Sequence, residues 1–133
     1  MKTWQNLALT SSLDSSDVHE WTWDGQDLLL FRNIDGNWHA ISAYCPHMQN
    51  YIPNGLPPGS SLDKLLTPQG LNCPYHGWVF DGSGHCVSIP PGQPVPKWAM
   101  GEKPATEAWA CRVEGEWLQI LADQVTTGPP QSP

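Results

Sequence analysis

Apolar and polar positions alternate along much of the chain, and short turn signals interrupt them. Segments 4–9, 27–33 and 37–43 have this period of two, which is typical of half-buried β-strands. Asp35 and Gly36 separate the last two segments and favour a tight hairpin. The first third of the chain therefore predicts antiparallel strands.

The second half of the chain repeats this form twice. Segments 77–80 and 85–89 flank a glycine-rich turn, and segments 107–113 and 116–121 flank a Glu-Gly turn. An earlier Asp-Gly pair at 24–25 marks one more turn. We therefore predict an all-β fold.

Composition agrees with short strands and many turns. The 133 residues include 14 Pro and 12 Gly, and only 14% are charged. This length suits one core. We predict a single domain over residues 1–122, followed by a polar, proline-rich and disordered tail over 123–133.

Two proline-rich stretches lie between the predicted strands. Residues 52–69 are expected to form an exposed loop in which only 62–66 could make about one turn of helix. The stiff run 90–96 could lie as a fixed flap over a neighbouring loop, although a simple connector is the more common role.

The acidic charge balance argues against nucleic acid and membrane surfaces as partners. A net charge of −7 disfavours nucleic acid and anionic membrane surfaces, which call for clustered Lys and Arg. The N-terminus lacks the apolar run of a secretory signal, and no stretch approaches the ~20 apolar residues of a membrane span. We expect a monomer in the cytoplasm.

Two short motifs each combine one cysteine with one histidine. They are Cys45-Pro-His47 and Cys73-Pro-Tyr-His76, with 25 residues between His47 and Cys73. A classical zinc finger pairs Cys with Cys and His with His in its two motifs. Mixed motifs on two facing loops can instead place both thiolates on one iron and both imidazoles on another. The motifs therefore favour a two-metal cluster, with a Cys2His2 zinc site as the rival interpretation.

The run from Cys73 to Pro90, CPYHGWVFDGSGHCVSIP, resembles the Rieske 2Fe-2S domain family. It is most similar to the Rieske domains and ferredoxins of aromatic-ring hydroxylating oxygenase systems. The first motif, YCPHM at 44–48, agrees, and the resemblance covers about residues 28–90. It implies the Rieske fold of stacked antiparallel sheets, with a small cluster-binding subdomain over about 44–90.

The same resemblance implies one Rieske-type 2Fe-2S cluster. Its ligands would be Cys45, His47, Cys73 and His76, with the outer ring nitrogens of both histidines facing solvent. The chain departs from the family at Met48 and Gln49, where a basic residue and a glycine are common. It also has extra residues at about 56–66 between the two motifs.

High-potential respiratory Rieske proteins carry an extra cysteine in each loop, and Ser and Tyr hydroxyls that bond to the cluster sulfurs. The matching positions here are Asn50, Tyr75, Trp78 and Phe80. No disulfide can join the loops, and both hydroxyl donors are missing. We therefore expect a potential at the low end of the Rieske band.

The remaining cysteines and the nearby tryptophan have simpler expected roles. Cys86 and Cys111 are expected to pack in the core, because the motifs already supply four ligands. Trp78 lies two residues after His76, and core packing is its expected main role, with shielding of the cluster from water as a second one.

Three functions compete. The first is an electron carrier between a reductase and a terminal oxygenase, for example in a dioxygenase system, and not itself an enzyme. The second is the electron-input domain or subunit of such an oxygenase; residues 91–133 contain no His for a catalytic mononuclear iron. Met1 and the proline-rich ending favour a complete small protein. The third is a zinc-stabilised binding module without redox activity.

Overall fold

The computed structural model describes residues 2–123, and these form an all-β structure, as predicted. The helical elements among these residues are three short 3-10 helices, and no helix there is long and apolar enough to cross a membrane. The elements are, in chain order, β1 (Lys2–Leu9), η1 (Thr10–Leu13), β2 (Val18–Trp23), β3 (Gln26–Arg32), β4 (Trp38–Ser42), η2 (Ile52–Gly55), η3 (Leu62–Leu65), β5 (Leu66–Thr67), β6 (Gly70–Asn72), β7 (Val79–Phe80), β8 (Cys86–Ser88), β9 (Ala108–Trp109), β10 (Cys111–Glu114) and β11 (Trp117–Asp123).

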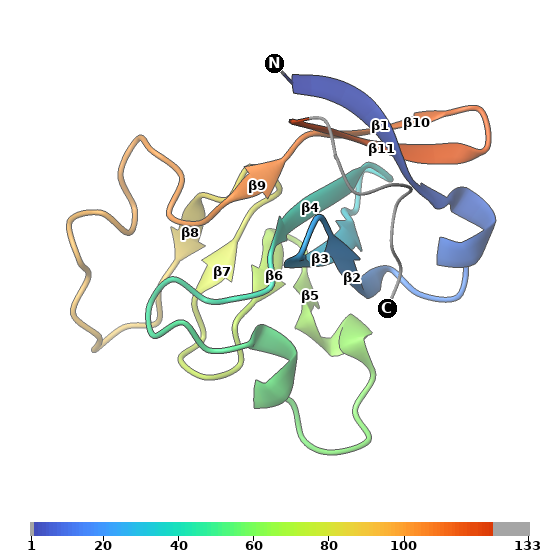
Figure 1. Ribbon diagram of the computed structural model, residues 1–133. Coiled ribbons are helices and arrows are strands. Elements are labelled where there is room, and N and C mark those ends of the chain that lie inside the picture. The colour runs from blue at the N-terminus through green and yellow to red at the C-terminus, as the bar shows by residue number, and fades with distance from the viewer. Residues whose placement is uncertain (1, 124–133) are drawn as a thin grey trace.

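The strands form three antiparallel sheets, with strand orders β1-β11-β10, β2-β3-β4-β9 and β5-β6-β7-β8. Figure 1 shows them following one another from the upper right to the lower left of the molecule. The stacked antiparallel sheets predicted from the sequence are confirmed. The predicted disordered tail at 123–133 lies outside the described residues, apart from Asp123, which ends β11.

Strand β3 is buried on both faces and forms the centre of the stack. Leu29 and Phe31 belong to one apolar cluster, whereas Leu28 and Leu30 belong to a second one, and all four are 0% exposed. Successive side chains of a strand point to opposite faces. The run LLLF therefore supplies both cores, at about 1.5–3 kcal/mol for each fully buried side chain.

Two predicted strands differ clearly from the structure. The strand expected over 77–80 is limited to Val79–Phe80, and the one expected over 107–113 is interrupted. Segment 107–113 was expected to be continuous, but it divides at Ala110. Strand β9 pairs with β4, whereas β10 pairs with β11, so the chain passes from one sheet to another at this residue. The alternating pattern predicts strand conformation and carries no information about which sheet each half joins.

The expectation of an exposed loop over residues 52–69 is wrong in part. Ile52 and Leu65 are each 1% exposed and pack in the core. The predicted turn of helix is present as η3, and the chain continues directly into β5. Apolar side chains within a proline-rich stretch thus anchor it to the body of the domain.

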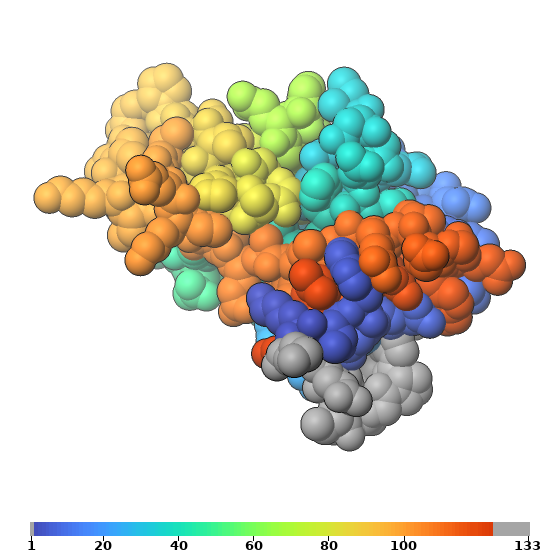
Figure 2. Space-filling view, turned by 90° about the horizontal axis from the view of Figure 1, so that it is seen from above, coloured from blue at the N-terminus to red at the C-terminus, as the bar shows by residue number. Residues whose placement is uncertain are grey.

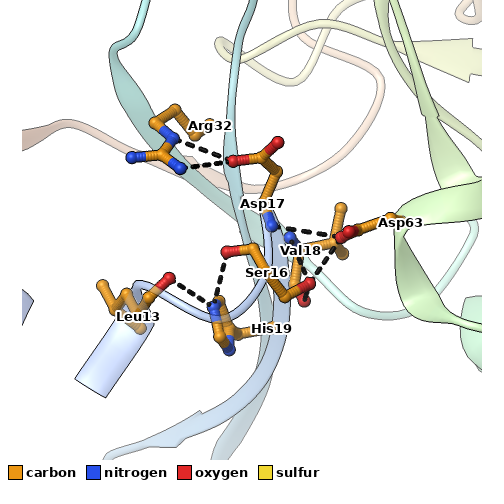
Figure 3. A network of polar contacts seen from close by, with 7 residues as sticks. All are labelled: Leu13, Ser16, Asp17, Val18, His19, Arg32 and Asp63. Carbon is orange, nitrogen blue, oxygen red and sulfur yellow. Dashed lines mark hydrogen bonds and ion pairs between the residues drawn. The ribbon is translucent and has the colours of Figure 1, made fainter. Parts of the chain in front are cut away.

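Polar contacts also anchor the extra residues at 56–66. The Asp63 carboxylate accepts hydrogen bonds from the Ser16 hydroxyl and, at 3.1 Å, from the backbone N–H of Asp17. The Asp17 carboxylate in turn accepts two from Arg32, at 2.9 and 2.6 Å. Figure 3 shows how this network joins η3 to the start of β2 and the end of β3.

The loop after β4 is closed by two backbone hydrogen bonds. The N–H of Cys45 donates to the carbonyl of Asn50 at 2.8 Å, and the N–H of Gln49 donates to the carbonyl of Cys45 at 2.7 Å. Gln49 has a φ of 57°, in the left-handed region. This conformation reverses the chain within six residues.

The loop between β6 and β7 has the same pattern. The N–H of Cys73 donates to the carbonyl of Trp78 at 2.7 Å, and the N–H of Gly77 donates to the carbonyl of Cys73 at 2.8 Å. Gly77 has a φ of 81° and is the counterpart of Gln49. The two motif loops are therefore built on one backbone frame, with a glycine in the left-handed position of only one of them.

We expect Asp63→Ala to lower the free energy of unfolding by about 1 kcal/mol, because this charged but exposed acceptor loses one hydrogen bond from the Ser16 hydroxyl and one from the backbone N–H of Asp17. Urea denaturation measures this change, and proteolysis should cut near residue 63 more readily. Lys64→Ala, an exposed change on the same 3-10 helix, is the matched control. Equal stability of the two variants would contradict the anchoring role of Asp63.

Gln49→Gly should raise the free energy of unfolding by about 0.5–1 kcal/mol. A left-handed residue with a Cβ costs about 1–2 kcal/mol, and the added freedom of glycine in the unfolded chain offsets part of that gain. Urea denaturation of the protein checks the change. Met48→Gly, at the preceding exposed position, gains no relief of strain and should be slightly destabilising. If Gln49→Gly lost as much stability as Met48→Gly, the left-handed conformation of Gln49 would not be strained.

Candidate metal centre

Cys45 and Cys73 lie at the starts of the two loops and meet in the interior. They are 2% and 1% exposed, and the Cys45 thiol donates a hydrogen bond to the Cys73 sulfur. This hydrogen bond and burial raise the pKa of Cys45, whereas accepting the bond lowers the pKa of Cys73. The pair can therefore offer two sulfur donors on one side of the site.

Backbone amides point at both sulfurs. In each loop the N–H groups two and three positions after the cysteine donate to its sulfur and favour the thiolate. These residues are His47 and Met48 for Cys45, and Tyr75 and His76 for Cys73. The shared backbone frame of the loops thus gives each buried sulfur two amide donors.

His47 and His76 form a second pair beside the cysteines. Their ring centroids are 4.6 Å apart, with an angle of 74° between the ring planes. His76 is exposed, whereas His47 is partly buried and its Nδ1 is buried without a hydrogen-bond partner among the described residues. A buried imidazole nitrogen with a free lone pair can bind a metal ion. The two imidazoles therefore present nitrogen donors on the outer side of the site.

The Trp78 indole packs against one face of the His47 ring. The two rings are stacked, with centroids 4.3 Å apart and an angle of 11° between their planes. Trp78 is 0% exposed and also contacts Phe80 and the half-exposed Trp98. The expected core packing of Trp78 is confirmed, and its position against His47 also keeps water from that face of the ring.

The proline-rich run 90–96 lies against the second loop, so the flap interpretation is the correct one. A Cβ on Gly77 would lie 2.7 Å from Cγ of Pro90. The Gln93 side chain accepts a hydrogen bond from Trp78 Nε1 at 3.0 Å and donates one to the carbonyl of His76 at 2.6 Å. Glycine at position 77 is thus required by its φ and by the close approach of the run.

The structure brings Cys45 together with Cys73 and His47 together with His76. Within residues 2–123 no three or more Cys, His, Asp or Glu side chains are arranged around a single ion position. The side chains are instead segregated into a sulfur pair and an imidazole pair. This donor set fits a two-iron cluster with different ligands on its two metals.

The other two cysteines, Cys86 and Cys111, do not belong to the two motif loops. Cys86 is buried in the core, as expected. Cys111 is only partly exposed and packs against the second apolar cluster, where burial raises the pKa of its thiol to about 12. All four cysteines are free thiols in the structure.

Sequence analysis missed two residues next to the site. Gln93 was treated as part of a stiff run, and Trp98 was not considered. A single amide side chain among four prolines was a signal for Gln93, because such a residue has no local partner. Trp98 has no comparable signal, since its contact with Trp78 depends on the course of the whole run.

Comparison with protein families and known proteins also indicates a 2Fe-2S domain. The model of the family described as "Rieske [2Fe-2S] domain" matches residues 3–99. Cholesterol 7-desaturase nvd 1 of Ciona intestinalis is 33% identical over 109 residues, which are 82% of this chain and 20% of that protein. The oxygenase component of a 3-ketosteroid-9-alpha-monooxygenase of Rhodococcus rhodochrous is 27% identical, over 96% of this chain and 29% of that protein.

Solved structures agree on the fold. The crystal structure of apo dicamba monooxygenase matches with a TM-score of 0.66 and 26% identity, over 96% of this chain and 35% of that one. The chain therefore spans about a fifth to a third of the length of these relatives. The predicted Rieske fold is confirmed. This chain belongs to the Rieske [2Fe-2S] domain family, and its cofactor is a 2Fe-2S cluster.

Proposed function

We propose that this domain carries single electrons between a reductase and a terminal oxygenase, such as a dioxygenase, or a similar acceptor. Cys45, His47, Cys73 and His76 would hold the cluster, within a cluster-binding subdomain over about residues 44–90. The observation that carries the proposal is the segregation of two buried, hydrogen-bonded thiols from two adjacent imidazoles, of which His76 is exposed and His47 partly buried.

Each group of this chain has a defined task in that function. Cys45 and Cys73 would bind one iron and the two histidines the other, and the bound cluster would supply one-electron redox chemistry. The amide N–H groups at the sulfurs stabilise negative charge there. Trp78 excludes water from one face of His47, whereas the exposed His76 gives a redox partner access to the site.

A second candidate is the electron-input domain or subunit of an oxygenase. It is favoured by relatives that are named as oxygenases or an oxygenase component, of which this chain matches only a part. Gel filtration together with a reduction assay distinguishes the two. A separate carrier elutes as a monomer and reduces an added terminal oxygenase, whereas a subunit elutes with a catalytic partner.

The four free cysteines suit the reducing cytoplasm, where we place the protein.

The zinc-stabilised module is the remaining alternative. Zinc accepts the same four side chains, but it is colourless and has no redox chemistry. Iron analysis, visible absorption and low-temperature EPR after reduction test this directly. A protein with stoichiometric zinc, no colour and no signal in the reduced state would overturn the electron-transfer proposal.

His47→Ala and His76→Ala should each abolish the visible absorption of the cluster and its bound iron. The apo site leaves two loops without the metal that ties them, so the melting temperature should fall as well. His85→Ala is the matched control, because this ring bonds to Ser83 and to the carbonyl of Glu102 in a turn. Full iron content in either of the first two variants would show that the ligands are wrong.

The midpoint potential should lie at the low end of the Rieske band, on the order of −150 mV. Two neutral imidazoles raise the potential above that of all-cysteine clusters, but position 80 is a phenylalanine and position 78 a tryptophan, so neither offers a hydroxyl to a sulfur. A redox titration of the purified protein measures this value. A midpoint well above zero would contradict the expectation.

A further inference from the structure

We propose that Gln93 is a positioning residue of the cluster site. With one side-chain amide it holds both Trp78 and the backbone of His76, and thereby fixes the ring of His47 and the second loop relative to each other. This inference rests on the ligands given under the proposed function.

The Gln93 side chain points into the molecule from an exposed run. Gly92, Pro94 and Val95 are exposed, whereas Gln93 is partly buried. Its Oε1 accepts from the indole N–H of Trp78 at 3.0 Å, and its Nε2 donates to the carbonyl of His76 at 2.6 Å. Both halves of the amide are therefore used for the site.

The two contacts require an amide of this length. The indole N–H can only donate and a backbone carbonyl can only accept, so their common partner must do both. A carboxylate at position 93 could accept from Trp78 but could not donate to His76. A methionine has similar length and would make neither bond. The orientation of the Gln93 amide is fixed by the same reasoning.

Trp78 connects Gln93 to the proposed ligand His47. Its indole is 0% exposed, so without Gln93 its N–H would be a buried donor with no partner. Leaving such a group unpaired is costly enough to favour another orientation of the ring. Because Trp78 is stacked on His47 at 4.3 Å, any reorientation of the indole moves the surface that supports His47.

The run 90–96 that carries Gln93 is stiff and packs against the second loop. Pro90, Pro94 and Pro96 fix their backbone φ angles, and Pro90 lies against Gly77 so closely that no Cβ would fit there. Figure 2 shows the yellow-orange and orange surface of this part of the chain projecting at one end of the molecule. Little conformational entropy is therefore lost when Gln93 makes its two bonds.

The donor bond from Gln93 also acts on the electrostatics of the second loop. An N–H dipole at the carbonyl of His76 withdraws electron density from the peptide that follows a ligand residue. Hydrogen bonds of this outer kind orient metal ligands and tune the metal, with effects of 10–100-fold on affinity in other sites. Loss of Gln93 should therefore lower the midpoint potential and weaken retention of the cluster.

The test uses the cluster-loaded protein and the variants Gln93→Met, Trp78→Phe and their combination. Gln69→Met, at an exposed position between β5 and β6, is the matched control. The measurements are the midpoint potential at one pH, the EPR g values of the reduced cluster and the half-life of the cluster against an iron chelator. Circular dichroism checks that each variant is folded.

We expect Gln93→Met to lower the midpoint potential, to change the g values and to shorten the half-life of the cluster at least threefold, while Gln69→Met matches the unmodified protein. Because Gln93 acts in part through Trp78, its effect should be less than additive with that of Trp78→Phe. If the unmodified protein holds the cluster and Gln93→Met behaves as Gln69→Met does, this inference is overturned and the proposed function stands. If the unmodified protein holds no 2Fe-2S cluster, both are overturned.

Discussion

The candidate site depends on a single backbone arrangement that occurs twice. In each loop the cysteine N–H and carbonyl bond to residues five and four positions later, which reverses the chain within six residues. The amides that follow the cysteine then point at its sulfur, so negative charge on a buried sulfur has donors in place before any metal binds. Everything else in the domain serves to keep these two loops opposed.

The central sheet provides that opposition. The first loop follows β4, and the second joins β6 to β7, so the two loops extend from different sheets of the stack. The sheets are held together by an apolar cluster that contains Phe31, Phe80 and both cysteines. Trp78 belongs to the same cluster and also lies against His47. Packing of the core and geometry of the site are therefore not separable at this residue, and a change in one alters the other.

The features that could be predicted from the sequence are local. The spacing within Cys45-Pro-His47 and Cys73-Pro-Tyr-His76 determines which donors share a loop, and the Asp-Gly pair at 24–25 is enough for a two-residue hairpin, with both residues at positive φ. A long continuous motif also identifies the family without any knowledge of the sheets.

The features that escaped prediction all depend on distant parts of the chain. The change of sheet at Ala110 follows from which neighbours are available, and the burial of Leu65 from space left in the core. Gln49 has a left-handed backbone because its loop must match the one that contains Gly77, although nothing in its side chain favours that conformation. Gln93 has partners 15 and 17 residues away, beyond the reach of any local pattern.

If the domain exchanges electrons as proposed, the separation of thiols from imidazoles would let it do so without opening. A thiolate carries a full charge and needs amide donors to remain in the interior, which the loops supply. A neutral imidazole carries no such cost and can stand at the surface, as His76 does. Under the proposed function, the charged ligands would lie inside and the neutral ones outside. A partner would then approach the site through the histidines, without movement of the core or of the run held by Gln93.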